Sequence, residues 1–173
     1  PEELGKAPFT VSHSRAVETE IAGVACHIIP GLSAFVGGDI TAGILASGML
    51  EQEASTLLID LGTNGEMALG NRHRLHACAT AAGPAFEGGA NRGIWGADMV
   101  RLLQKLLEEG LMDGQGLLKE PYFTKGVRIG DVLVTKESVR AVQLAKGAIA
   151  AGIEILADSY GIRFSDISKV VLA

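Results

Sequence analysis

The sequence predicts an α/β fold in which helices flank a mixed sheet, and three patterns support this prediction. Short apolar runs separated by glycine-containing turns, over 56–70 and 73–80, are typical of antiparallel strands that follow one another in a meander. Apolar residues at spacings of three and four, over 97–110 and 135–156, are typical of helices that pack against a core. A last apolar run, 167–173, predicts one more strand, which we expect to be buried.

The composition sets the class of protein. With 173 residues, 47% hydrophobic and 20% charged, the chain is long enough for one domain or one large lobe of a domain. Its net charge of −5 argues against a broad surface for nucleic acid or for an anionic membrane. Cys26 and Cys78 form no CxxC motif, so we expect buried free thiols and no structural zinc. The chain has no leader and no apolar run of membrane-spanning length, which predicts a cytoplasmic protein.

The N-terminal third contains the first candidate site residue. Residues 1–23 are weakly patterned, and we expect an extended segment with one short helix around 14–21; residues 24–29 then predict a strand. A glycine turn leads into a helix over 40–50 that is small on one face and apolar on the other. Asp39 lies at or near the N-cap of this helix. It either caps the helix, which its spacing favours, or positions a water molecule.

The central segment 56–70 is predicted to be a hairpin with a carboxylate at its turn. Asp60 closes the first strand, and burying a carboxylate is costly unless something pairs with it. Gly62 and Gly65 bracket Thr63 and Asn64, so we expect backbone with positive φ and free N–H groups that form a concavity for an anion. The alternative is an ordinary hairpin in which Asp60 only caps the turn.

The segment that follows the third strand is unusual in composition. Residues 81–89 are too rich in glycine and proline for a helix or strand, yet too apolar for an ordinary solvated loop, so we expect this loop to pack over a site. A helix over 97–110 comes next, with Gly110 as its C-cap. Its predicted apolar stripe consists of Met99, Val100, Leu102, Leu103, Leu106 and Leu107.

Two short strands and a long helix complete the chain. The strands are predicted at 127–129 and 132–134. Thr135 is the predicted N-cap of the long helix, and Glu137 is favourable in its first turn. The core-facing residues of this helix are predicted to be Val139, Val142, Ala145, Ile149, Ile153 and Leu156.

This order of motifs resembles the second half of the nucleotide-binding fold shared by actin, sugar kinases and heat-shock chaperone ATPases. The residues that carry the resemblance are the helix DITAGILA (39–46), the hairpin LLIDLGT (57–63) and the last strand VVLA (170–173). More specifically, IDLGTNGE (59–66), ACATAAGPAFEG (77–88) and VQLAKGAI (142–149) resemble the C-terminal region of the reductive activators of corrinoid proteins. The resemblance implies a ribonuclease-H-like (actin-like ATPase) lobe over residues 31–173, with 1–30 as a lead-in from a preceding lobe.

The resemblance also implies a function and a set of site residues. Members of that family use ATP and Mg²⁺ to help return a cobalt(II) corrinoid protein to the cobalt(I) state, with the electron drawn from a ferredoxin-like iron–sulfur domain. By analogy, Asp60 would orient a magnesium-bound water, and Asp39 would position the attacking water. The backbone of Gly62, Thr63, Asn64 and Gly65 would contact the terminal phosphates. The family motifs also include Glu66, Gly83, Pro84 and Glu87, whose individual roles the residues do not reveal.

Parts of the family pattern lie outside this sequence. The first phosphate loop is expected upstream, the adenosine loop after residue 173, and the iron–sulfur cluster in a preceding domain. We therefore expect the isolated chain to bind ATP weakly and to be inactive, with a corrinoid protein as the partner of the full-length protein; a homodimer is also possible. Two alternatives stay open: a sugar or small-acid kinase lobe of the same superfamily, and a non-catalytic protein-docking lobe.

Overall fold

The computed structural model describes residues 17–33, 35–86 and 96–173, which fall into two compact units. The first unit consists of Pro1–Asp60, Glu66–Ala79 and Ile155–Ala173, and the second of Leu61–Gly65 and Thr80–Glu154. None of the helices in the described ranges combines the length and the apolar character needed to cross a bilayer.

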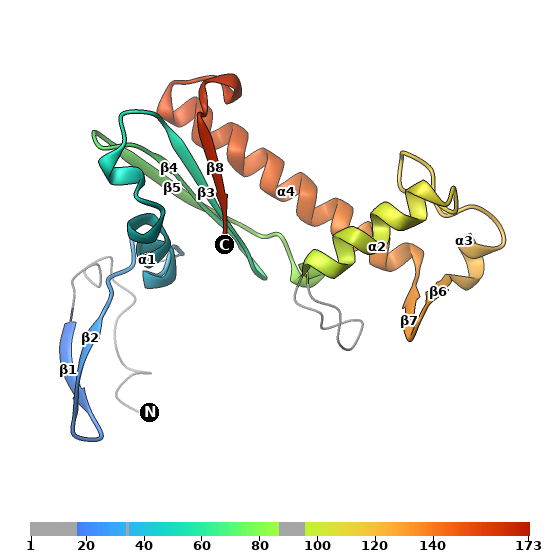
Figure 1. Cartoon of the computed structure of the whole chain (residues 1–173), viewed down its shortest axis with the longest axis horizontal. Helices are drawn as coiled ribbons and strands as arrows, with labels where there is room; N and C mark the ends of the chain where they lie inside the picture. The colour runs from blue at the N-terminus through green and yellow to red at the C-terminus, as the bar shows by residue number, and fades with distance from the viewer. Residues whose placement is uncertain (1–16, 34, 87–95) are drawn as a thin grey trace. The chain divides into compact units, whose positions relative to one another are not determined.

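A four-stranded sheet forms the first unit (Figure 1), in the order β5-β4-β3-β8. Strand β8 runs parallel to β3, with Lys169 opposite Thr56. The turns from β3 to β4 and from β4 to β5 are only three and four residues long, and such short turns join antiparallel neighbours, because parallel strands need a long crossover. The predicted mixed sheet with its meander is therefore confirmed. Its strands are β3 (Thr56–Leu61), β4 (Gly65–Gly70), β5 (Leu75–Thr80) and β8 (Lys169–Leu172).

Helix α1 (Gly38–Ser47) and the short 3₁₀ helix η3 (Met49–Glu51) contribute to the core of this unit. A side chain at Gly43 would bring its Cβ within 3.0 Å of Leu58 Cδ2, so the absence of a side chain lets α1 lie close to β3. The predicted helix with one small face is confirmed. The buried residues of this core are Val36, Ile40, Ile44, Met49, Leu58 and Ala68.

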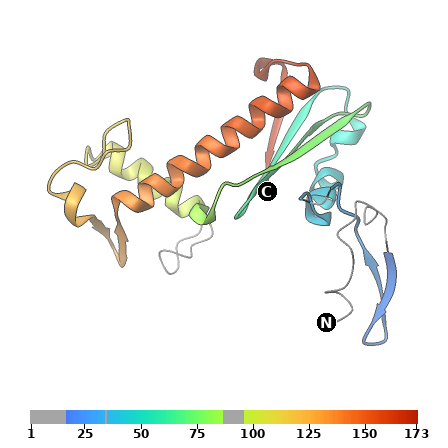
Figure 2. The same ribbon diagram turned by 180° about the vertical axis from the view of Figure 1, so that it is seen from behind.

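Strands β1 (Val17–Ile21) and β2 (Val24–Ile28) form a separate two-stranded antiparallel ribbon (Figure 2). The predicted strand over 24–29 is confirmed, but the short helix predicted around 14–21 is wrong for 17–21, and 14–16 lie outside the described residues. The reason lies in the sequence: apolar or β-branched residues at 17, 19 and 21 alternate with glutamates at 18 and 20, which is the period of a strand.

The second unit contains α2 and most of α4. Its core consists of Leu106, Met112, Leu118, Val127, Val134 and Val139. The predicted stripe of α2 is too wide, because Val100 and Leu107 are 52% and 44% exposed. The elements are η4 (Pro84–Phe86), α2 (Gly96–Glu108), α3 (Tyr122–Lys125), β6 (Val127–Ile129), β7 (Val132–Val134) and α4 (Lys136–Tyr160), whose last residues belong to the first unit.

The N-terminus of α4 has the predicted cap. The Ser138 N–H donates to Thr135 Oγ1 at 3.4 Å, and the Thr135 N–H donates to Ser138 Oγ at 3.4 Å. Hydrogen bonding from the Thr135 side chain, followed by the helix backbone, lowers the pKa of Glu137, which therefore stays ionised in the first turn of the helix.

Strand β8, which follows the 3₁₀ helix η5 (Phe164–Asp166), corrects the last prediction for the sheet. The sequence predicts a buried strand, yet Val170 and Leu172 are 52% and 66% exposed. The strand lies at the edge of the sheet, and only Val171 packs against the core described above. An apolar run by itself does not distinguish a strand covered on both faces from one covered on a single face.

Candidate functional site

Asp60 is the second-to-last residue of β3, directly after four buried residues. It is half-buried, so its carboxylate is neither sealed in the core nor fully in water. Within the described ranges, no hydrogen bond or ion pair uses this carboxylate, so the turn cap that the sequence left open for Asp60 is not formed there. A half-buried carboxylate without a protein partner is suited to a cation or to water held by a cation.

The turn after Asp60 is held by backbone contacts. The Gly62 N–H donates to the Asn64 carbonyl oxygen at 3.1 Å, and the Gly83 N–H donates to the Thr63 carbonyl oxygen at 2.7 Å. Thr80 Oγ1 donates to the Gly65 carbonyl oxygen at 3.2 Å. Residues 80–83 therefore support the turn within the second unit, and we name residues 61–65 the phosphate loop after the role that the resemblance predicts for them.

The two glycines of the phosphate loop do not serve the purpose expected from the sequence. Neither Gly62 nor Gly65 has positive φ, so the prediction of left-handed backbone is wrong. Gly65 is instead a position of close packing: a Cβ there would lie 2.8 Å from Thr80 Oγ1 and 3.1 Å from Ile149 Cγ1. Thr80 and Ile149 are thus supporting residues that sequence analysis missed. The sequence indicated only that Thr80 lies in a predicted strand and Ile149 on a predicted helix face, and not that they contact Gly65.

The phosphate loop offers two N–H groups to a ligand. Thr63 and Asn64 are both exposed, and in the part of the chain that the structure describes neither backbone N–H has a hydrogen-bond acceptor. The Gly62 N–H, which the sequence also predicted to be free, is used within the turn. Successive unpaired N–H groups in a turn form an anion-binding concavity.

The other predicted site residues lie at different places. Glu66 is half-buried in β4, Gly83 has a φ of 78°, and Pro84 begins η4 and is exposed. The first part of the apolar loop thus contacts the phosphate loop through the Gly83–Thr63 hydrogen bond. Glu87 lies outside the described residues.

Asp39 is not the N-cap of α1. The N-cap is Gly37, and Asp39 lies in the first turn, exposed, with Oδ1 accepting a hydrogen bond from the Ile40 N–H at 2.9 Å. Asp39 thus lies near the N-cap as predicted, but its predicted capping role is wrong, because the extended glycine at the N-cap has no side-chain cap hydrogen bond. The exposed carboxylate leaves the water-positioning role as a prediction.

Asp60 and Cys78 are the residues whose metal-binding and thiol chemistry can be assessed from the structure. Within the described residues, no group of three or more His, Cys, Asp or Glu side chains is placed to hold a metal ion. A magnesium ion held by one carboxylate, water and phosphate oxygens needs no such group, so Asp60 fits that kind of site. Burial raises the pKa of the Cys78 thiol, which therefore stays protonated at neutral pH.

Helix α1 precedes the hairpin of β3 and β4, whose first strand carries Asp60 near its end, and the long helix α4 leads into β8, which pairs parallel to β3. This order of elements is that of an actin-like ATPase lobe. Residues 54–92 and 89–173 match the family described as the C-terminal domain of RACo, the ASKHA domain, and the chain belongs to this family. The resemblance to the C-terminal region of reductive activators is thereby confirmed.

Named relatives agree with this membership. The chain is 31% identical over 238 residues to the corrinoid activation enzyme RamQ of Eubacterium limosum, covering 100% of this chain and 40% of that protein. It is 42% identical over 65 residues to the [Co(II) methylated amine-specific corrinoid protein] reductase of Methanosarcina barkeri, covering 36% of this chain and 12% of that protein. A solved structure, the reductive activator for corrinoid,iron-sulfur protein, matches with a TM-score of 0.74 and 28% identity, over 87% of this chain and 32% of that one. The chain therefore spans less than half the length of each of these relatives.

Proposed function

We propose that this chain supplies the second phosphate-binding loop of an ATP-dependent reductive activator that returns a cobalt(II) corrinoid protein to the cobalt(I) state. The observation that carries the proposal is the unpartnered, half-buried carboxylate of Asp60 next to a turn with two free N–H groups. The printed names of the relatives, a corrinoid activation enzyme and a Co(II) corrinoid protein reductase, support the substrate class.

In this proposal the chain's own groups bind and orient the nucleotide. The N–H groups of Thr63 and Asn64 donate to oxygens of the terminal phosphates, and the Asp60 carboxylate accepts a hydrogen bond from a magnesium-bound water. Bound Mg²⁺ neutralises part of the triphosphate charge. The Gly83–Thr63 hydrogen bond and the close packing of Gly65 keep the loop in one conformation, so that little ordering is needed when the nucleotide binds.

ATP dependence is coherent with the chemistry of the corrinoid. Reduction of a cobalt(II) corrinoid is unfavourable at common biological potentials, so a reductant alone leaves the protein mostly oxidised. A nucleotide-bound activator that binds the easily reduced state of the corrinoid protein more tightly shifts the population toward that state. We propose that the electron comes from an iron–sulfur domain elsewhere in the full-length protein.

The test follows cobalt(I) formation by visible absorption. The full-length protein, a corrinoid protein and a reductant are mixed with and without Mg-ATP, and ADP serves as the nucleotide control. We expect cobalt(I) to accumulate only with ATP. Equal cobalt(I) formation in the absence of nucleotide, or phosphorylation of a small substrate in its place, would overturn the proposal.

A further inference from the structure

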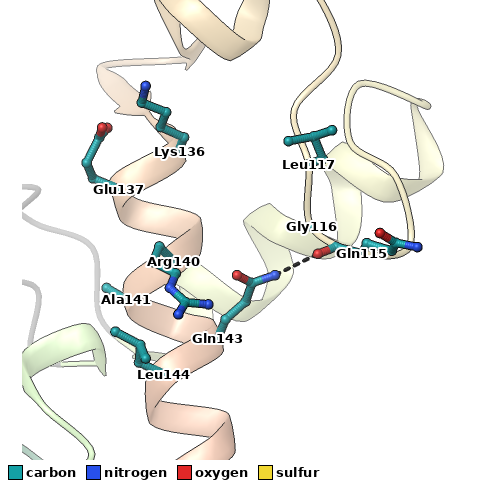
Figure 3. A pocket seen from close by; sticks show the side chains of 9 residues that line it. All are labelled: Gln115, Gly116, Leu117, Lys136, Glu137, Arg140, Ala141, Gln143 and Leu144. Atoms are coloured by element: carbon teal, nitrogen blue, oxygen red, sulfur yellow. Dashed lines mark hydrogen bonds between the residues drawn. The ribbon is translucent and has the colours of Figure 1, made fainter.

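A groove lies in the second unit and is lined by residues outside the phosphate loop. Its volume is about 630 Å³, and it runs between the loop at Gln115, Gly116 and Leu117 and the first turns of α4 (Figure 3). The helix side consists of Lys136, Glu137, Arg140, Ala141, Gln143 and Leu144.

The loop wall of the groove is held in place before any ligand binds. Asp113 Oδ1 accepts hydrogen bonds from the N–H groups of Gln115 and Leu117, at 2.9 and 2.8 Å. Gln143 Nε2 donates to the Gln115 carbonyl oxygen at 2.7 Å and so ties the loop to α4 (Figure 3). Gly116, with φ at 81°, leaves room for this bond, because a Cβ there would collide with the Gln143 amide. A preformed wall lowers the ordering cost of binding.

The helix wall carries two cations, of which Arg140 has no acidic partner among the described residues, while Lys136 lies beside the Glu137 carboxylate and its charge helps to lower the pKa of that group. Lys136 and Arg140 are four residues apart on α4, where like charges repel, and both are exposed. Lys136 lies over the Phe123 ring at 4.9 Å, and Arg140 has no hydrogen bond or ion pair with any described residue. Glu137 forms no ion pair with Arg140 within the described residues, and the two side chains point in opposite directions in Figure 3.

Exposed apolar side chains accompany these cations. Leu117 on the loop and Leu144 on the helix are 54% and 56% exposed, one on each side of the groove. The groove is more open than enclosed, which suits one side of an extended polypeptide better than a small ligand that must be enclosed. The chain as a whole has a net charge of −5, whereas the groove is lined by two cations and one carboxylate, so the groove is more favourable to an acidic segment than the average charge of the chain indicates.

We propose that this groove docks an acidic segment of a partner protein, in which carboxylates flank one apolar side chain. The carboxylates pair with Lys136 and Arg140, and the apolar side chain lies between Leu117 and Leu144. This inference does not rest on the proposed nucleotide chemistry.

The experiment measures fluorescence anisotropy of a short labelled peptide in which acidic residues flank a central leucine, titrated with the full-length protein. We expect saturable binding that weakens as salt is added, no binding of the peptide with amides in place of the carboxylates, and weaker binding of the peptide with glycine in place of leucine. The double variant Lys136→Gln/Arg140→Gln should bind about tenfold more weakly. The matched control Lys146→Gln changes an exposed lysine of the same helix outside the groove and should bind like the wild type.

Three results would overturn the proposal. One is the absence of binding by the acidic peptide. Another is equal loss of binding in the groove variant and the control. The last is full displacement of the peptide by an equimolar small anion such as inorganic phosphate, which would make the groove a small-anion site. Because both changed side chains are exposed, circular dichroism and thermal unfolding of the double variant should match the wild type.

Discussion

At the scale of single residues, a substitution at Gly65 tests the close packing that supports the phosphate loop. The change Gly65→Ala places a Cβ 2.8 Å from Thr80 Oγ1 and 3.1 Å from Ile149 Cγ1, and both neighbours must move. We expect a loss of about 1–3 kcal/mol in the free energy of unfolding, as is typical of overpacking. Urea denaturation measures it.

The matched control for that change is Gly62→Ala in the same turn. A Cβ at this position meets only the Asn64 carbonyl oxygen at 3.6 Å, an ordinary contact, and φ is not positive. Its free energy of unfolding should stay within about 1 kcal/mol of the wild type. Equal destabilisation of the two variants would show that Gly65 is not a special packing position.

The hydrogen bonds of Asp166 predict how the stability of the fold depends on pH. The Arg163 side chain and then its backbone N–H hydrogen-bond this carboxylate and hold its pKa below the ordinary value, which is about 3.9 in the unfolded chain. A lowered folded-state pKa means that the stabilisation is present above the unfolded pKa and is lost as the pH falls through the folded pKa. Asp166→Asn should therefore be less stable than the wild type at neutral pH.

Urea denaturation of Asp166→Asn and the wild type over a pH series checks this. The difference in stability should shrink as the pH falls below about 4. Arg163→Gln should remove most of the same pH-dependent difference, because the partner of the carboxylate is gone. A difference that grows toward acid pH would contradict the assignment.

At the scale of secondary-structure elements, the N-cap of α4 is the point most easily tested. Thr135→Ala removes the hydroxyl that accepts the Ser138 N–H and should cost about 1 kcal/mol of stability. Thermal unfolding measures it. Thr124→Ala, an exposed threonine in α3 with no side-chain hydrogen bond recorded within the described residues, is the control. A similar loss in both variants would show that the cap contributes nothing of its own.

The elements also show how far periodicity predicts structure. The hairpin of β3 and β4, helices α1, α2 and α4, and the strands β6 and β7 follow from apolar spacing and glycine turns. Strand β1 has a period-two pattern that favours a strand over the predicted helix, and the exposure of β8 depends on which face of the sheet is covered, which no local pattern states. The N-cap of α1 is Gly37 and not Asp39, and the sequence did not indicate this because a glycine N-cap has no side chain that marks it.

At the scale of the whole molecule, the lobe and its family were predictable because the acid-then-glycine hairpin is continuous in sequence. Of its supports, Gly83 belongs to the loop that the sequence predicted to pack over a site, whereas Thr80 and Ile149 reach the hairpin only through the tertiary fold and were not predictable. The same holds for the groove, where residues 115–117 lie opposite α4, which begins only at Lys136. Contacts of this kind leave no periodic pattern.

The size of the chain leads to a further expectation. Because it spans 40% of RamQ and 32% of the matched solved structure, the other groups that contact a nucleotide are expected elsewhere in the full-length protein. Isothermal titration with Mg-ATP should show weak or no binding to the isolated chain, and clear binding to the full-length protein. Micromolar affinity in the isolated chain would contradict this division of the site.

The most direct test of the central claim is the affinity of the full-length protein for Mg-ATP when Asp60 loses its charge. Isothermal titration compares the wild type, Asp60→Asn and the control Asp98→Asn, which changes an exposed acid in the first turn of α2. Our account predicts binding at least about tenfold weaker in Asp60→Asn, in line with the loss of an outer-shell partner of a metal ion, and wild-type binding in the control. Wild-type affinity in Asp60→Asn would contradict the claim that this carboxylate and the phosphate loop hold the nucleotide.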